Sequence, residues 1–342
     1  MPPNLEAQRK TANDLKKHWK PRNDRFEDWY SIREMEDKYA KEGWESIALN
    51  GGRTFFDVAL FFLSHRAPTI RVAVLGKPDE EQERSADAEY FLAGVHRVID
   101  RGRSRSGEKP WVEALAESLL LTGWYAYTRG SDKDPDGKAE FFLDVYDPSD
   151  CYPEWGNGRM EKLAHIYSIS GSKVKTKANK LGWKAEFELT GSTDEVTLYD
   201  FWEWVQEEDG EEALYNTVWV EGRGVTQKGS RPGTGWAVLV EPTIKDEDCI
   251  PIQNGPVNGW STGSKRPDRK KMRVTHLGES ILEAGRTIWD AKNRWTTDIM
   301  QKSHDAAVPS FTASSRGGDW VVAERDMIAG VVIPKRLDEE LT

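Results

Sequence analysis

The sequence predicts an α+β fold, because helical periodicity dominates the first 123 residues and strand-like alternation follows Gly123. A second observation is a long amphipathic segment over residues 280–307. A third is the aromatic content, 11% of 342 residues, which supplies large side chains for a core. We therefore expect a globular protein with a helical part, a β-rich part and one long helix.

Residues 1–23 are polar, and we expect a tail or a frayed segment there. Residues 24–123 form the predicted helical part. Residues 54–64 have almost no polar face, which indicates a fully buried helix. The predicted elements are a helix from Asn23 or Asp24 to Gly43, a helix over 54–64, a strand over 69–75, a helix over 78–99, a basic loop over 101–109 and a helix over 110–121.

Residues 124–275 form the predicted β-rich part. Residues 251–275 contain several Gly and Pro and a basic cluster over 265–271, so we expect a long loop there. The other predicted elements are a hairpin of strands 124–129 and 141–145, strands over 163–170, 195–205, 215–220 and 236–241, and a short basic helix over 173–181.

The long helix has clear predicted ends. Ser280 and Glu283 match a capping box, and Val308-Pro309 predicts the stop because the residue before proline avoids the α region. One apolar stripe about 80° wide predicts the buried face. Its members are Ile281, Ala284, Ile288, Ala291, Trp295 and Ile299. Residues 308–342 then predict short extended pieces, over 310–313, 320–323 and 331–333.

Charge and composition exclude some classes of protein. The net charge of −10 argues against a protein that coats nucleic acid, although it allows DNA to pass through a ring. Cys151 and Cys249 are too few for a disulfide framework, so we interpret them as free thiols. The most apolar stretch, over residues 55–63, has about half the length that crosses a bilayer, so no membrane contact is expected.

The sequence contains no familiar catalytic motif, so we expect no enzyme, metal or cofactor. Asp132, Asp134 and Asp136 resemble the opening of a calcium loop, but position twelve is Leu143 instead of Glu, which favours a solvated turn. The six histidines form no pair with metal-ligand spacing, and they are His18, His65, His96, His165, His276 and His304.

A tryptophan-rich stretch leaves an alternative open. Trp202 and Trp204 lie two apart on a predicted strand and would share a face. With Trp219 and Trp236 they could stack on a sugar, although packing against helices is the favoured interpretation.

The order of these parts resembles the portal, or head–tail connector, proteins of tailed bacteriophages. The resemblance covers most of residues 25–335. It is carried by the segments WESIALNGGRTFFDVALFFLSHRAPTIRV, WVEALAESLLLTGWYAYTR, FFLDVYDPSDCYPEW, TLYDFWEWV, IPIQNGPVNGW and GESILEAGRTIWDAKNRWTTDIMQKSHDAAVPSF. It implies a phage-portal-like fold with a helical part of the wing over 24–123, a β-rich part of the wing over 124–275, a stem helix over 276–307 and a short β clip segment over 308–342. The chain is expected to end before the second stem helix and crown of that family.

The resemblance also implies a function. The chain would be a structural subunit of a ring, twelve-fold in the family pattern, at one capsid vertex of the virion, made in the cytoplasm of the host bacterium. DNA would be packaged and ejected through the ring without sequence-specific binding. The implied partners are the terminase large subunit, a head–tail adaptor and the major capsid or scaffold protein.

Three groups of site residues follow from this interpretation. The helix face opposite the stripe is expected to look into the channel, a second flank to pack on a neighbouring subunit, and a turn after the helix to dock partners. The channel residues are Arg286, Asn293, Arg294, Thr297 and His304; the interface residues are Trp289 and Met300; and the docking residues are Arg316, Gly317, Gly318, Asp319 and Trp320.

Two other functions stay open on the sequence. One is a virion-associated carbohydrate-binding or glycan-cleaving protein that uses the tryptophan-rich sheet. The other is a different structural protein of the head or baseplate.

Overall fold

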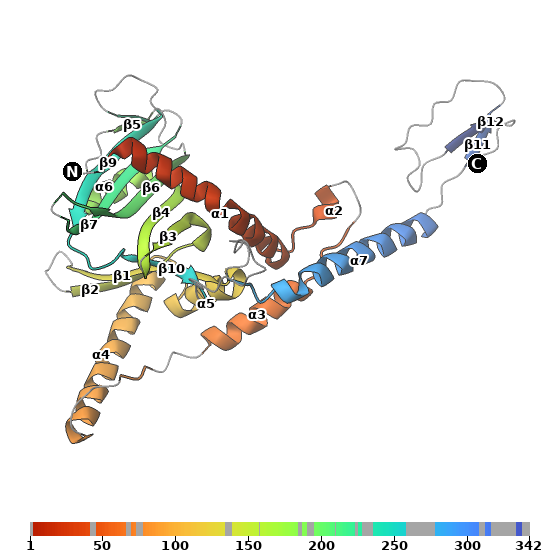
Figure 1. The fold of residues 1–342 in the computed structure, drawn as a ribbon. Helices are drawn as coiled ribbons and strands as arrows, with labels where there is room; N and C mark the ends of the chain where they lie inside the picture. The colour runs from red at the N-terminus through yellow and green to blue at the C-terminus, as the bar shows by residue number, and fades with distance from the viewer. Residues whose placement is uncertain are drawn as a thin grey trace, which may run out of the picture. The chain divides into compact units, whose positions relative to one another are not determined.

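The computed structural model has mixed α and β structure, as the sequence predicts (Figure 1). It divides into two compact units, one formed by Met1–Asp28 with Val58–Ile281 and the other by Trp29–Asp57 with Leu282–Thr342. The structure describes residues 3–41, 46–65, 70–72, 78–133, 139–156, 158–183, 187–189, 195–208, 210–222, 225–227, 235–257, 278–307, 312–315 and 333–336.

A five-stranded antiparallel sheet organises the first unit, in the order β3-β4-β6-β7-β9. Its strands are β3 (Cys151–Gly156), β4 (Arg159–Ser170), β6 (Glu195–Gln206), β7 (Glu212–Glu221) and β9 (Trp236–Lys245). The last four confirm predicted strands, and β6 and β7 pair over ten residues.

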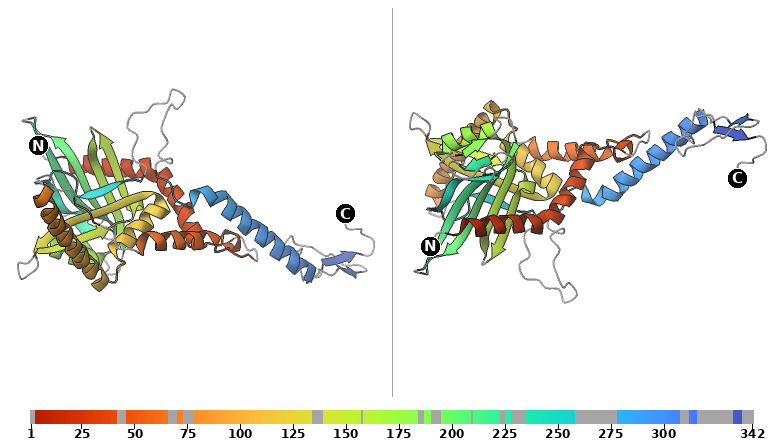
Figure 2. Two further views of the ribbon diagram at one scale, coloured as in Figure 1. Left: turned by 90° about the horizontal axis from the view of Figure 1, so that it is seen from below. Right: turned by 90° about the horizontal axis from the view of Figure 1, so that it is seen from above.

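Helix α1 (Leu5–Arg33) lies along one face of this sheet (Figures 1 and 2). The expectation of a polar tail over residues 1–23 is therefore wrong. The inward side chains recur at alternating spacings of four and three, which sets a single helical seam. Two of the six are polar, and this hides the seam in the sequence. The seam comprises Gln8, Ala12, Leu15, Trp19, Arg22 and Phe26.

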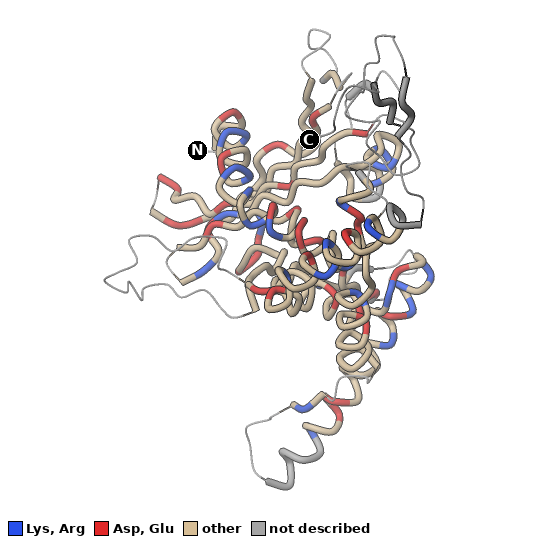
Figure 3. The backbone as a smooth tube through the Cα atoms, turned by 90° about the vertical axis from the view of Figure 1, so that its right-hand side faces the viewer, with Lys and Arg blue, Asp and Glu red and all other residues tan. Residues whose placement is uncertain are grey.

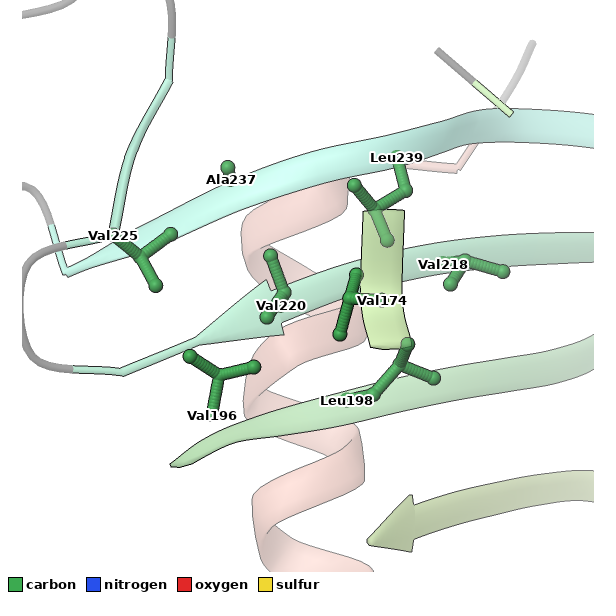
Figure 4. Close-up of a cluster of buried hydrophobic side chains, with 8 residues drawn as sticks. All are labelled: Val174, Val196, Leu198, Val218, Val220, Val225, Ala237 and Leu239. Atoms are coloured by element: carbon green, nitrogen blue, oxygen red, sulfur yellow. The ribbon is translucent and has the colours of Figure 1, made fainter. Parts of the chain in front are cut away.

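The opposite face of the sheet is covered at one end by helix α6 (Gly171–Leu181). Alternate residues of the central strands point to this face, because successive side chains of a strand point to opposite sides. Figure 4 shows the apolar cluster that results, with the faint red ribbon of α1 behind the strands. The cluster contains Val174, Val196, Leu198, Val218, Val220, Val225, Ala237 and Leu239.

A three-stranded sheet, ordered β10-β1-β2, covers the other end of that face. Strands β1 (Trp124–Lys133) and β2 (Ala139–Val145) confirm the predicted hairpin. Strand β10 (Ile252–Pro256) pairs with β1 and lies within the stretch 251–275, where the sequence predicted a loop. Ile252 and Asn254 are buried there, so tertiary pairing stabilises a strand that has no strong β propensity.

The remaining elements are shorter or helical. They are α2 (Lys38–Lys41), α3 (Gly51–Ser64), α4 (Pro78–Arg105), α5 (Trp111–Thr122), the 3₁₀ turn η1 (Pro148–Asp150), β5 (Phe187–Leu189) paired with β8 (Val225–Gln227), the 3₁₀ turn η3 (Glu283–Gly285), α7 (Arg286–Ala307), and β11 (Thr312–Ser315) paired with β12 (Ile333–Arg336).

Helices α3, α4 and α5 confirm predicted helices, with two corrections. Helix α4 continues to Arg105, into the stretch predicted as a basic loop. Helix α3 is not fully buried, because only Phe56 and Leu60 of its large apolar side chains are covered. Residues 70–72 of the predicted strand over 69–75 are not extended in a sheet, and the rest of that prediction lies outside the described residues.

Arg22 joins α1 to the turn before β3. Its guanidinium is buried and donates to the carbonyl oxygens of Pro148 and Cys151, at 2.9 and 3.0 Å. It also lies over the rings of Trp19 and Trp124, at 4.8 and 4.6 Å from the ring centroids. Burial lowers the pKa of Arg22 to about 10, which leaves it charged at neutral pH.

We predict that Arg22→Met lowers the free energy of unfolding by about 2–4 kcal/mol, because it removes two buried hydrogen bonds from a charged donor. Urea denaturation followed by tryptophan fluorescence would measure this. The control is Lys20→Met on the same helix, whose exposed pair with Asp24 contributes only about 0.3–0.5 kcal/mol. Equal effects of the two substitutions would contradict a special role for Arg22.

Candidate functional site

Helix α7 is the candidate site, and it begins six residues later than the sequence predicts, at Arg286. The predicted capping box is wrong because tertiary contacts occupy both side chains. Ser280 Oγ donates to the carbonyl oxygen of Leu120 at 3.1 Å. The Glu283 carboxylate accepts a hydrogen bond from Trp29 Nε1 at 2.8 Å. These contacts leave Glu283–Gly285 as a 3₁₀ turn that leads into α7.

Trp289 packs within its own chain, on three glycines. A Cβ atom at Gly51 would lie 2.9 Å from the Trp289 ring, and one at Gly285 would lie 2.5 Å from Trp289 Nε1. A Cβ atom at Gly52 would lie 3.7 Å from the Trp289 ring, at ordinary van der Waals distance. We predicted that Trp289 faces a neighbouring subunit, but most of its surface is already covered within the chain.

Two residues that were predicted to face a channel are instead used within the second unit, one in a hydrogen bond and one in a buried position. The side chain of Asn293 accepts a hydrogen bond from the amide of Leu49 at 2.9 Å. Thr297 is only 2% exposed, so its predicted channel position is wrong. Segment 46–57 contacts α7 at Trp289 and Asn293, on a side of the helix where we expected solvent.

The other predicted site residues of α7 are less constrained. Arg294 is exposed, Arg286 keeps 41% of its side-chain surface beside Glu283, and Met300 is half-buried. The side chain of His304 lies outside the described residues, as do all five predicted docking residues over 316–320. Beyond α7 the structure describes only the short parallel pair of β11 and β12.

The apolar stripe predicted as the buried face of α7 is exposed instead. We call Ile288, Ala291, Trp295 and Ile299 the α7 stripe. Ile288 is 53% exposed, Trp295 70% and Ile299 64%. The four residues recur at intervals of three and four, so they share one side of the helix. A chain by itself therefore leaves this side of α7 unpacked.

The charges around the α7 stripe have mixed sign. Asp290 and Asp298 alternate along the helix with Lys292, Arg294 and Lys302. Figure 3 shows both signs interspersed over the described part of the chain. This surface therefore has no strong field that would attract a polyanion, and burial of its apolar side chains is the larger energetic term.

The fold brings together a row of titratable side chains that no spacing in the sequence indicated. Cys151, His165 and Asp200 are direct neighbours across β3, β4 and β6. Burial lowers the pKa of His165 to about 3 and raises the pKa of Cys151 and of Asp200. The thiol thus stays protonated and the imidazole neutral, and a protonated thiol is a poor nucleophile. The row is consistent with a packed polar layer.

The tryptophan-rich stretch is part of the core. Trp202 and Trp219 are buried, and Arg9 covers Trp236 at 4.4 Å from its ring centroid. Trp204 is half-buried under the guanidinium of Arg159, at 4.1 Å. Two of the four rings are therefore buried and an arginine lies over each of the other two, which supports the packing interpretation.

Further features of the described residues bear on the predicted classes. They include no group of three His, Cys, Asp or Glu side chains that could hold a metal ion. None of the helices within these residues is both long and apolar enough to cross a bilayer. Comparison with protein families and with characterised proteins finds no match to this chain.

The buried imidazole predicts a pH dependence. His165 titrates near pH 6.5 when unfolded and near 3 when folded, so the unfolded state gains protons first as the pH falls. Stability that is fully present above pH 6.5 is therefore lost below it. From pH 7.5 to pH 5, we expect the wild type to lose about 2 kcal/mol relative to His165→Phe.

The measurement is urea denaturation of both proteins at each pH, compared as a difference so that other titrating groups cancel. His18→Gln, on the exposed side of α1, is the control. The prediction fails if the two substitutions change the pH dependence equally.

The space around two helical glycines predicts opposite effects of their substitution, because Gly52 of α3 lies against Ile32 of α1 whereas Gly94 of α4 has open space beside it. A methyl group at Gly52 would lie 2.6 Å from Ile32 Cγ2, so Gly52→Ala should lower the free energy of unfolding by about 1–3 kcal/mol. Gly94→Ala adds a methyl group in open space within α4 and should raise it by about 0.5–1 kcal/mol. Thermal or urea unfolding of both variants tests this, and a stabilising Gly52→Ala would contradict the packing.

Proposed function

We propose that this chain is a structural subunit of a tailed-phage portal, and that identical chains form a closed ring around a channel for double-stranded DNA. The observation that carries the proposal is the exposed α7 stripe. Three large apolar side chains on one helix face are costly in water, and burial against another subunit removes that cost. The order of elements that resembles portal proteins supports the same interpretation.

A ring requires contacts of a particular kind. Each chain must present two different surfaces, because a head-to-tail interface closes into a ring only when the rotation per subunit divides a full turn. The family pattern sets the expected number at twelve. The portal-like division into wing, stem helix and clip belongs to this proposal too.

In this role the protein hydrolyses nothing itself. It acts as a conduit and as a docking collar for the terminase large subunit, a head–tail adaptor and the capsid or scaffold protein. DNA passes without sequence-specific contacts, and the acidic balance of the chain disfavours tight binding of phosphates. The buried position of Trp202 and Trp219 removes the main support for the carbohydrate-binding alternative.

The proposal predicts a large, symmetric particle. Twelve copies of a 38.9 kDa chain (12 × 38.9) have a mass of about 467 kDa. Native mass spectrometry should find this species at micromolar concentration, and negative-stain averages should show rotational symmetry with a central hole. A monomer, a trimer or a compact particle without a hole would refute the portal function, and a symmetric sheet or a small oligomer would favour another head or baseplate protein.

The α7 stripe gives the matching substitution. Trp295→Asp places a charge in a buried contact, so we expect the dissociation constant between subunits to rise by at least 30-fold, or about 2 kcal/mol per contact. Thr287→Asp adds the same charge at an exposed position of α7 that lies off the stripe, and should leave the assembly intact. Light scattering after size-exclusion chromatography measures both. Intact rings with Trp295→Asp would contradict the role of the stripe.

A further inference from the structure

Helix α3 carries a second unpacked apolar surface. We call Phe55, Val58, Phe61, Phe62 and Leu63 the α3 surface; each is at least half exposed, and Phe62 reaches 75%. At 100° per residue these side chains spread over about 200° of the helix circumference. A helix of this kind is ordinarily buried on nearly all sides. Here only Phe56 and Leu60 are covered.

The α3 surface and the α7 stripe are alike in chemistry and size. Both are helical, apolar and without a charged side chain of their own. From the exposed fractions, each leaves on the order of 400–500 Å² in water, given about 150–250 Å² for a large aromatic side chain. A stable interface buries about 800 Å² per partner, with an apolar centre and a polar rim. Each surface has the size of such a centre.

A ring needs two different surfaces on every chain, and α3 and α7 each provide one. Helix α4 exposes a further apolar group, Tyr90, Phe91 and Val98, but its 28 residues are strongly charged, and we take α3 because its exposed group is larger. We propose that the α7 stripe of one chain docks on the α3 surface of the next. This inference rests on the proposed function, because it takes a second copy of the chain as the occupant of both surfaces. Helix packing suits the pair, because the row of stripe residues spaced by three and four forms a ridge that fits between the aromatic side chains of α3.

The main competing arrangement is self-pairing of the α7 stripe. Two copies would then bury the same surface around a twofold axis, and the assembly would close as a dimer. That arrangement would leave the α3 surface in water. The head-to-tail arrangement covers both surfaces with one kind of contact, and it is compatible with any number of subunits.

Cross-linking of two kinds of chain separates these arrangements. The exposed Cys249 is first replaced by Ser, and the buried Cys151 is kept. One chain then carries Val58→Cys and the other, with a different tag, carries Ala291→Cys. Both substitutions are small, and they keep the large side chains of the two surfaces in place. The coexpressed chains are treated with a short bismaleimide and separated on a denaturing gel.

The expected product is a covalent dimer with one chain of each kind, and neither chain alone should cross-link. Such a dimer cannot arise within one chain. If Ala291→Cys alone gives covalent dimers, the stripe pairs with itself and the inference is overturned. If the ring mass is intact but no mixed dimer forms, the inference fails while the proposed function stands. If the wild type is a monomer, the proposed function fails first and the docking contact with it.

A second pair, Leu63→Cys with Ile299→Cys, controls for the placement of the cysteines. It samples the same two surfaces about one turn away on α3 and two turns away on α7. Mixed dimers with either pair support the contact. As a negative control, Val58→Cys is combined with Asp290→Cys, which is exposed on the side of α7 away from the stripe. Equal yields with Asp290→Cys and Ala291→Cys would show collision without a defined interface, and would overturn the inference.

Discussion

The fold of the first unit depends on a guanidinium that is buried between a helix and a sheet. Arg22 brings a positive charge into the core, and the effective cost of such burial is several kcal/mol unless hydrogen bonds replace the lost water. Two carbonyl acceptors and the faces of Trp19 and Trp124 supply the replacement. One acceptor belongs to the turn before β3 and the other to the first residue of β3, so these hydrogen bonds fix the position of α1 along the sheet. The rest of the helical seam then packs in one register.

This arrangement explains where apolar surface remains. Helix α1 covers one face of the five-stranded sheet, and α6 with the three-stranded sheet covers the other, so the large aromatic side chains of the β-rich part are used internally. Trp202 and Trp219 therefore have no surface role. The exposed aromatic and aliphatic side chains are concentrated on helices α3, α4 and α7. Monomeric proteins rarely expose large apolar patches, and the assembly that we propose would cover them.

Local patterns predicted the elements that do not depend on distant partners. The hairpin of β1 and β2, the strands β4, β6, β7 and β9, and the helix stopped by Gly123 follow from alternation, turn residues and a glycine with positive φ. Other elements depend on contacts with residues distant in the sequence, and the sequence analysis did not predict them. Strand β10 needs β1 as a partner, and helix α1 needs the sheet to reveal that a polar sequence has a buried seam.

The sequence by itself determined that the chain has mixed α and β structure and that residues 288, 291, 295 and 299 share one apolar side of a long helix. Periodicity is a local property, and it specifies which side chains lie together. Only the tertiary structure decided which side faces the chain. Trp289 and Asn293 are held by glycines and by a backbone amide from segment 46–57, so the polar side of α7 packs inward. The apolar periodicity of one helix contains no information about its contacts with a segment more than 200 residues away in the sequence. Because that segment packs on another side of α7, the apolar stripe stays exposed.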